Sequence, residues 1–139
     1  MSAERNLRIV QDMYAAFARG DVGFVIEQID EACDGFGVVS GTRTGAPWHV
    51  PTDMKGKAGA MRYFESLAGI EHVAFEQRDF AATGDQVYAT IHLVLRDKKT
   101  GKTIEQPEVV HHFTFKNGKV ARARVLEDTA ATRAAYAGA

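Results

Sequence analysis

The sequence contains a single cysteine, little excess of either charge and no long apolar segment. Cys33 stands alone, which excludes an internal disulfide framework and a Cys-x-x-Cys metal site. The 17 basic and 18 acidic residues give a net charge of −1, whereas general binders of nucleic acid or anionic membranes carry a clustered basic excess. No apolar run approaches the roughly 20 residues of a membrane span, and residues 1–20 lack a signal-peptide core. We therefore expect a cytoplasmic protein with neither a membrane nor a nucleic acid as its partner.

The composition is that of an ordinary globular domain. Of the 139 residues, 45% are hydrophobic and 25% are charged, and a chain of this length can bury a real core. No internal repeat, low-complexity segment or linker divides the sequence, so residues 1–139 are predicted to form one domain.

The first half of the chain has the spacing of amphipathic helices. In residues 4–19 apolar side chains recur every three or four positions, which predicts a helix with one buried face. Ser2 is its expected N-cap and Gly20 its expected end. Two further helices are predicted over residues 22–31 and 58–68. The residues expected on the buried faces are Leu7, Ile9, Val10, Met13, Tyr14 and Phe17, then Phe24, Val25 and Ile29, then Met61, Phe64 and Leu67.

Between the second and third helices, residues 32–53 are predicted to be irregular apart from a short strand near Phe36. Trp48 stands in a loop rich in turn-forming residues. A large aromatic side chain in a loop commonly covers a core, and it can also stack on a ligand. Phe36 and Trp48 are therefore candidates for contact with a ligand.

From Val73 onward the apolar residues alternate, which indicates strands joined by hairpins. Pro107 marks a bulge or an edge position in one of these strands. The strand over residues 86–96 is apolar on both faces, as is typical of a strand that is covered on both sides. The predicted strands span residues 73–80, 86–96, 103–115 and the second arm of the hairpin 109–127, and a short helix over 129–137 follows Asp128 as its cap.

The pairing within the last hairpin, residues 109–127, decides what surrounds His111. A two-residue turn would place His111 opposite Arg124. A three-residue loop with Gly118 in the left-handed conformation would place it opposite Ala123. We favour the second pairing because it joins a row of Phe and His side chains to a row of Ala and Val side chains. Large side chains facing small ones leave room on a buried face, and such room predicts a pocket.

The preceding hairpin is predicted to turn through a four-residue loop between Asp97 and Lys102, which would place Tyr88 opposite His111. A mostly apolar cavity with a phenol, a hydroxyl and imidazole groups has the usual make-up of a small-molecule site. The side chains that would share the pocket face are Tyr88, Thr90, His92, His111 and Phe113.

These residues do not predict a metal site or a catalytic triad. His92 and His111 would lie about 13 Å apart along the strands, which is too far for one zinc ion. His111 and His112 are adjacent and point to opposite faces. The sequence also lacks the nucleophile-elbow signature of a Ser-His-Asp enzyme.

The order of motifs resembles that of the SnoaL-like and ketosteroid-isomerase-like proteins of the nuclear transport factor 2-like (NTF2-like) superfamily. The resemblance is carried by residues 10–21 (VQDMYAAFARGD), 56–64, 111–120 (HHFTFKNGKV) and 127–130, in order and at similar spacing. It implies an α+β cone, in which three N-terminal helices pack on a strongly curved antiparallel sheet and a short C-terminal helix follows. It also implies a pocket inside the cone and a homodimer through the outer face of the sheet.

The resemblance does not imply steroid isomerisation. In ketosteroid isomerases a Tyr and a protonated Asp hold the enolate oxygen while a second Asp moves the proton. By this resemblance the corresponding positions here are Met13, His111 and a position near Gly37. In SnoaL-like polyketide cyclases the acid/base is an Asp on the last strand, and that position holds Val125. His111 remains a candidate acid/base group, without a matched acidic partner.

Two functions are therefore expected. The favoured one is a pocket protein that binds a small apolar molecule, polyketide-like or steroid-like, without turnover. The alternative is a cofactor-independent isomerase, cyclase or lyase, in which His111 moves a proton next to a carbonyl that Tyr88 or Tyr14 polarises. No cofactor and no metal are expected for either. The candidate ligand contacts are Met13, Tyr14, Phe17, Phe36, Trp48, Met61, Thr90, His92, Phe113, Ala123 and Val125.

Overall fold

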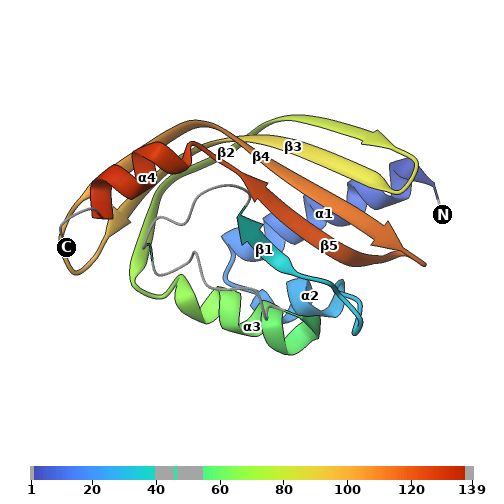
Figure 1. Cartoon of the computed structure of the whole chain (residues 1–139). Coiled ribbons are helices and arrows are strands. Elements are labelled where there is room, and N and C mark those ends of the chain that lie inside the picture. Colours follow the sequence, from blue (N-terminus) through green and yellow to red (C-terminus); the bar gives the residue numbers. More distant parts are fainter. Residues whose placement is uncertain (1, 40–45, 47–54, 137–139) are drawn as a thin grey trace.

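The computed structural model describes residues 2–39, 46 and 55–136, which fold into helices packed on one curved sheet (Figure 1). Trp48 lies outside the described residues. No helix among the described residues has the length and apolar character needed to cross a membrane. The helices are α1 (Ala3–Ala18), α2 (Val22–Glu27), α3 (Gly56–Ser66) and α4 (Thr129–Tyr136), and the strands are β1 (Phe36–Val39), β2 (Ile70–Thr83), β3 (Gln86–Asp97), β4 (Thr103–Lys116) and β5 (Lys119–Leu126).

The sheet has the strand order β1-β5-β4-β3-β2, and the three N-terminal helices lie on one side of it (Figure 1). Strands β2 to β5 pair antiparallel, as predicted, whereas β1 pairs parallel to β5. The sheet is therefore mixed at this edge, with one parallel pair beside the predicted antiparallel strands. The segment that leads into β1 already runs beside β5 in the same direction, because Asp30 N–H donates to Val120 O (2.9 Å) and Asp34 N–H to Ala121 O (2.8 Å).

Local signals fix the ends of α1, as predicted. The backbone N–H of Arg5 donates to Oγ of Ser2 (3.1 Å), which caps the first turn. Gly20 has a φ of +80°, the left-handed conformation in which glycine commonly ends a helix. The predicted second helix is shorter in the structure, because α2 ends at Glu27. The buried face of α1 carries Val10, Met13 and Tyr14 toward the sheet.

The last hairpin brings the predicted rows of side chains together, but with a different turn and a different strand register. Asn117 and Gly118 both have positive φ values, 51° and 78°, as a two-residue type I′ turn requires. The predicted three-residue loop is therefore wrong. The extra residue lies within β5 instead of the turn, and His111 pairs with Val125, two residues beyond the predicted Ala123. Because the shift is even, the Phe and His row still meets the Ala and Val row.

The predicted pairing of β3 with β4 is wrong by one residue over the half of the two strands that contains Tyr88 and His111. The 97–102 loop connects the strands as predicted, but β4 then contains one residue more than β3 around Pro107. The sequence indicated a bulge at Pro107, and the predicted pairing left it out. A shift of one residue exchanges the two faces of a strand. Tyr88 therefore pairs with His112 instead of His111.

Candidate functional site

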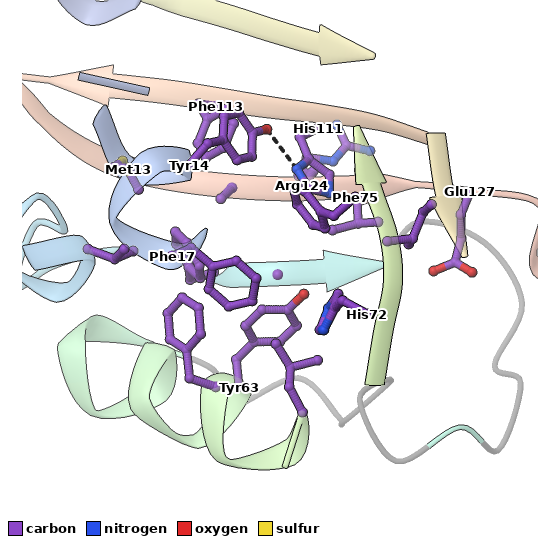
Figure 2. A pocket seen from close by; sticks show the side chains of 18 of the residues that line it. Met13, Tyr14, Phe17, Tyr63, His72, Phe75, His111, Phe113, Arg124 and Glu127 are labelled. Carbon is purple, nitrogen blue, oxygen red and sulfur yellow. Dashed lines mark hydrogen bonds between the residues drawn. The ribbon is translucent and has the colours of Figure 1, made fainter. Parts of the chain in front are cut away.

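A pocket lies between the inner face of the sheet and helices α1 and α3, with a cavity volume of about 100 Å³ (Figure 2). Most of its wall is apolar or aromatic. Side chains from α1, from α3 and from all five strands meet in it, together with Val25 of α2. The structure brings together eight of the predicted site residues in this wall, namely Met13, Tyr14, Phe17, Phe36, His111, Phe113, Ala123 and Val125.

The central polar feature of the pocket is a hydrogen bond between Tyr14 and His111. The hydroxyl oxygen of Tyr14 lies 2.8 Å from Nδ1 of His111 (Figure 2). The rings of Phe75, Phe80 and Phe113 lie within about 6 Å of the Tyr14 ring, with centroid separations of 5.9, 6.1 and 6.1 Å. The pair is therefore enclosed by aromatic side chains.

Both members of the pair are electrically neutral near pH 7. Burial lowers the pKa of His111 to about 4, although the negative charge of Glu127 acts in the opposite direction. Burial raises the pKa of Tyr14 well above its usual value of 10, and Tyr63 adds to this shift. If the Tyr14 hydroxyl donates to Nδ1, the single proton of the neutral imidazole is on Nε2. Within the described part of the chain, Nε2 of His111 has no hydrogen-bond partner.

Four predicted site residues lie outside the pocket. The bulge at Pro107 turns Tyr88, Thr90 and His92 to the outer face of the sheet. There Tyr88 stacks on His112 with ring centroids 4.4 Å apart, Thr90 donates to Asp79 and His92 contacts Glu76 and Glu105. Met61 is 43% exposed, because the buried stripe of α3 runs through Ala60, Tyr63, Phe64 and Leu67 instead.

The sequence analysis missed Tyr63, a central residue of the pocket. Its ring occupies the space in front of Gly37, where a Cβ would lie 2.5 Å from Cδ1 and Cε1 of Tyr63. The space beside this glycine is therefore filled by an aromatic ring. Burial raises the pKa of Tyr63 to about 12, with a further contribution from the charge of Glu127. Three- and four-residue spacing from Ala60 was the signal that could have identified it.

Other missed residues come from β2 and from the end of β5. His72 lines the pocket edge-on to Phe17, with ring centroids 5.4 Å apart. Burial lowers the pKa of His72, and the positive charge of Lys98 lowers it further. Irregular pairing of β2 with β3 after His72 hides this residue from a simple alternating pattern. Arg124 and Glu127 also line the pocket, and Figure 2 shows Glu127 at the end where β5 stops.

The fold and this pocket can now be compared with known proteins. A family model of the SnoaL-like domain matches residues 10–123. The chain belongs to the SnoaL-like domain family. The comparison confirms the resemblance to the NTF2-like superfamily. A comparison with curated proteins finds no match.

Solved structures of SnoaL-like and NTF2-like proteins share the fold over nearly the whole chain. An NTF2-like protein from Burkholderia xenovorans is 28% identical, with a TM-score of 0.80, and the alignment covers 97% of this chain and 98% of that one. TerC, co-crystallised with polyporic acid, is 21% identical, with a TM-score of 0.71 and coverage of 91% and 94%. A protein from Mesorhizobium loti designated a SnoaL-like polyketide cyclase is 20% identical, with a TM-score of 0.64 and coverage of 86% and 96%.

Proposed function

We propose that this SnoaL-like chain binds a small, uncharged, mostly apolar molecule that carries one hydrogen-bond acceptor, such as a ketone. The observation that carries the proposal is the neutral Tyr14–His111 pair in an aromatic wall. The rest of the wall offers dispersion contacts and excludes water. An apolar pocket with a few placed polar groups is the usual form of a small-molecule site.

The size of the cavity suggests a ligand of one or two rings. One water molecule needs on the order of 10–15 Å³ of such space. The cavity of about 100 Å³ therefore has room for more than one water molecule. We take single-ring aromatic compounds, rather than the steroid-sized ligands expected at first, as the ligands to test. The fold neighbour TerC, which was co-crystallised with polyporic acid, supports a ligand of aromatic character.

The acceptor on the ligand is expected to meet Nε2 of His111. If Nε2 carries the imidazole proton, it is a hydrogen-bond donor, and a carbonyl oxygen of the ligand could accept from it. The Tyr14 hydroxyl would hold the imidazole in the tautomer that presents this proton. Neither group needs to change its charge for binding, which suits a neutral ligand.

The test compares acetophenone with ethylbenzene, which has the same ring but no acceptor. We expect the unaltered chain to bind acetophenone more tightly than ethylbenzene. In His111→Phe the ratio of the two dissociation constants should shrink by about fivefold, which corresponds to one hydrogen bond of about 1 kcal/mol. His112→Phe is the matched control, because it makes the same change one residue away on the outer face. Calorimetric titration would measure both dissociation constants. The proposal would be overturned if the unaltered chain, His111→Phe and His112→Phe all had the same ratio of dissociation constants. It would also be overturned if neither probe bound.

A second candidate function is proton transfer next to a carbonyl, with His111 as the acid/base group. It is favoured by the Glu127 charge, which acts to raise the pKa of His111, and it fits the fold neighbour designated a polyketide cyclase. A pKa of about 4 makes His111 a weak base, which is why we place binding first. Catalysis predicts faster exchange of the acetophenone methyl protons in D2O, followed by NMR, and loss of this exchange in His111→Phe.

We also propose that two copies of the chain associate through the outer face of the sheet. Tyr88 exposes apolar surface there, at 36%. Tyr88→Glu should then shift the chain toward the monomer in sedimentation velocity. Met61→Glu, which alters an exposed apolar residue on α3, is the matched control. A chain that is monomeric before any substitution would overturn the association.

A further inference from the structure

The geometry points to Glu127 as the residue that selects the far end of the ligand: it favours a hydroxyl donor there and rejects a carboxylate. This inference rests on the proposed function, since it concerns the same pocket. It assigns the ligand a second polar group, so that the class becomes hydroxylated aromatic ketones. The sequence analysis did not name Glu127 as a site residue.

Two deeply buried polar side chains hold the Glu127 carboxylate in place. Its Oε2 accepts a hydrogen bond from Oγ1 of Thr132 (2.7 Å) and another from Nε2 of Gln106 (3.3 Å). Thr132 is 0% exposed and Gln106 is 1% exposed. The Gln106 amide is itself fixed, because its Oε1 accepts from the backbone N–H of Asp128 (3.0 Å). The carboxylate therefore has a defined direction at the wall of the pocket.

Capping of α4 does not account for this arrangement. The cap is Asp128, whose Oδ1 accepts from the backbone N–H of Ala131 (3.2 Å). Glu127 is joined instead to side chains, those of Thr132 on α4 and Gln106 on β4. Docking of α4 is also supported elsewhere, since the Tyr136 hydroxyl donates to Asp97 Oδ2 (2.7 Å). A carboxylate at this position consequently has a role in the pocket as well as in the helix.

The charge of Glu127 reaches the interior of the pocket. It raises the pKa of Tyr63 and opposes the effect of burial on His111, so both groups sense it. In a wall of low polarity a fixed negative charge repels a second one and strengthens a hydrogen bond from a hydroxyl. Arg124 also lines the pocket and would act in the opposite direction. If the pocket binds a ligand with a hydroxyl group more tightly than one with a carboxylate, the charge of Glu127 outweighs that of Arg124. The reverse preference would mean that Arg124 outweighs Glu127.

The experiment uses three ketones that differ only in the para substituent: 4′-hydroxyacetophenone, 4′-methylacetophenone and 4-acetylbenzoate. Calorimetric titration measures the dissociation constant of each for the unaltered chain, for Glu127→Gln and for Glu108→Gln. Glu127→Gln removes the charge and keeps a side chain that can accept from Thr132. Glu108→Gln removes a charge from an exposed position of β4 and is the matched control.

We expect the unaltered chain to bind the hydroxyl compound best and the carboxylate worst. Glu127→Gln should narrow the ratio of these two constants by about tenfold, equivalent to about 1.4 kcal/mol, while Glu108→Gln leaves it unchanged. As a measurement that needs no ligand, Glu127→Gln should lower the pKa of His111 further in an NMR titration of its ring protons. A residue that only anchors α4 would change the melting temperature without changing the order of the three ketones.

The outcomes separate the two proposals. If the unaltered chain binds the three ketones equally, or if Glu127→Gln retains the full discrimination, the role of Glu127 is overturned and the ketone site at His111 stands. A preference for 4-acetylbenzoate would show that Arg124 dominates, and it would also overturn the inference. If no ketone binds, the proposed function falls, and the inference falls with it.

Discussion

Two histidines on opposite faces of the sheet, His111 and His92, have imidazoles in opposite states. On the inner face, His111 has a neutral phenol as its partner and a pKa lowered by burial to about 4. On the outer face, His92 lies between two carboxylates, with Nδ1 2.8 Å from Glu76 and Nε2 3.1 Å from Glu105. Hydrogen bonds to Glu76 and then to Glu105 raise the pKa of His92.

The difference shows that the partners and the solvent, and not the residue type, decide what a histidine on this sheet can do. His92 uses both nitrogens to bridge neighbouring strands and has none left for a ligand. His111 uses one nitrogen within the wall. A site for a neutral molecule is therefore expected on the inner face only.

The largest effect expected from this comparison is the loss of unfolding free energy at acidic pH that His111 causes. Its folded-state pKa of about 4 lies below the unfolded value of about 6.5, so the stabilisation is complete above pH 6.5 and is lost as the pH falls toward 4. The loss should amount to about 3 kcal/mol of unfolding free energy. His111→Asn places Oδ1 where it can accept from Tyr14 and cannot become charged, so this variant should lack that part of the acid sensitivity.

Urea unfolding of both chains between pH 3.5 and pH 7 would measure the difference. His112→Asn, on the outer face, is the comparison variant. Burial lowers the pKa of His112 as well, so this variant should lose a smaller part of the acid sensitivity than His111→Asn. If the unaltered chain and His111→Asn lose stability in parallel below pH 6.5, the imidazole of His111 is solvated and the contrast between the faces disappears.

A smaller effect concerns how closely the inner face is packed. Gly37 and Gly20 have nearly the same φ, +79° and +80°, but a Cβ on Gly37 would overlap the Tyr63 ring, whereas a Cβ on Gly20 would have no atom within 4 Å. Gly20→Ala should therefore cost only the strain of the left-handed conformation, about 1–2 kcal/mol. Gly37→Ala should cost about 1–3 kcal/mol more, because the ring must move. Equal losses in denaturant unfolding would mean that the pocket wall yields without resistance.

Much of this fold could be predicted because its signals are local. Helix α1 follows from apolar spacing, the Ser2 cap and Gly20, and the order of β2 to β5 follows from alternation and turn residues. The inner row of His111 and Phe113 was predicted from alternation along β4. These features need only a few neighbouring residues.

The rest of the site depends on contacts between distant segments. One extra residue near Pro107 decides which face of β3 lines the pocket, and its effect on register can be seen only with both strands in place. The parallel pairing of β1 depends on where α2 lies. The role of Glu127 depends on Gln106, which is 21 positions away. Alternation and helical spacing contain no information about such contacts.

The smallest expected effect belongs to His92, and it should have the opposite sign to that of His111. Its folded-state pKa is raised above the unfolded value, so its stabilisation is present below about pH 6.5 and is lost as the pH rises through the folded-state pKa. The effect is small because Glu76 and Glu105 are 58% and 64% exposed, and solvent screens such pairs. His92→Gln should flatten the decline of unfolding free energy between pH 6.5 and 9, and 1 M NaCl should reduce the difference between the two chains. A decline that is the same in both chains would show that the carboxylates do not hold the proton on His92, and the outer face would then lack the ion pairs that set it apart from the inner one.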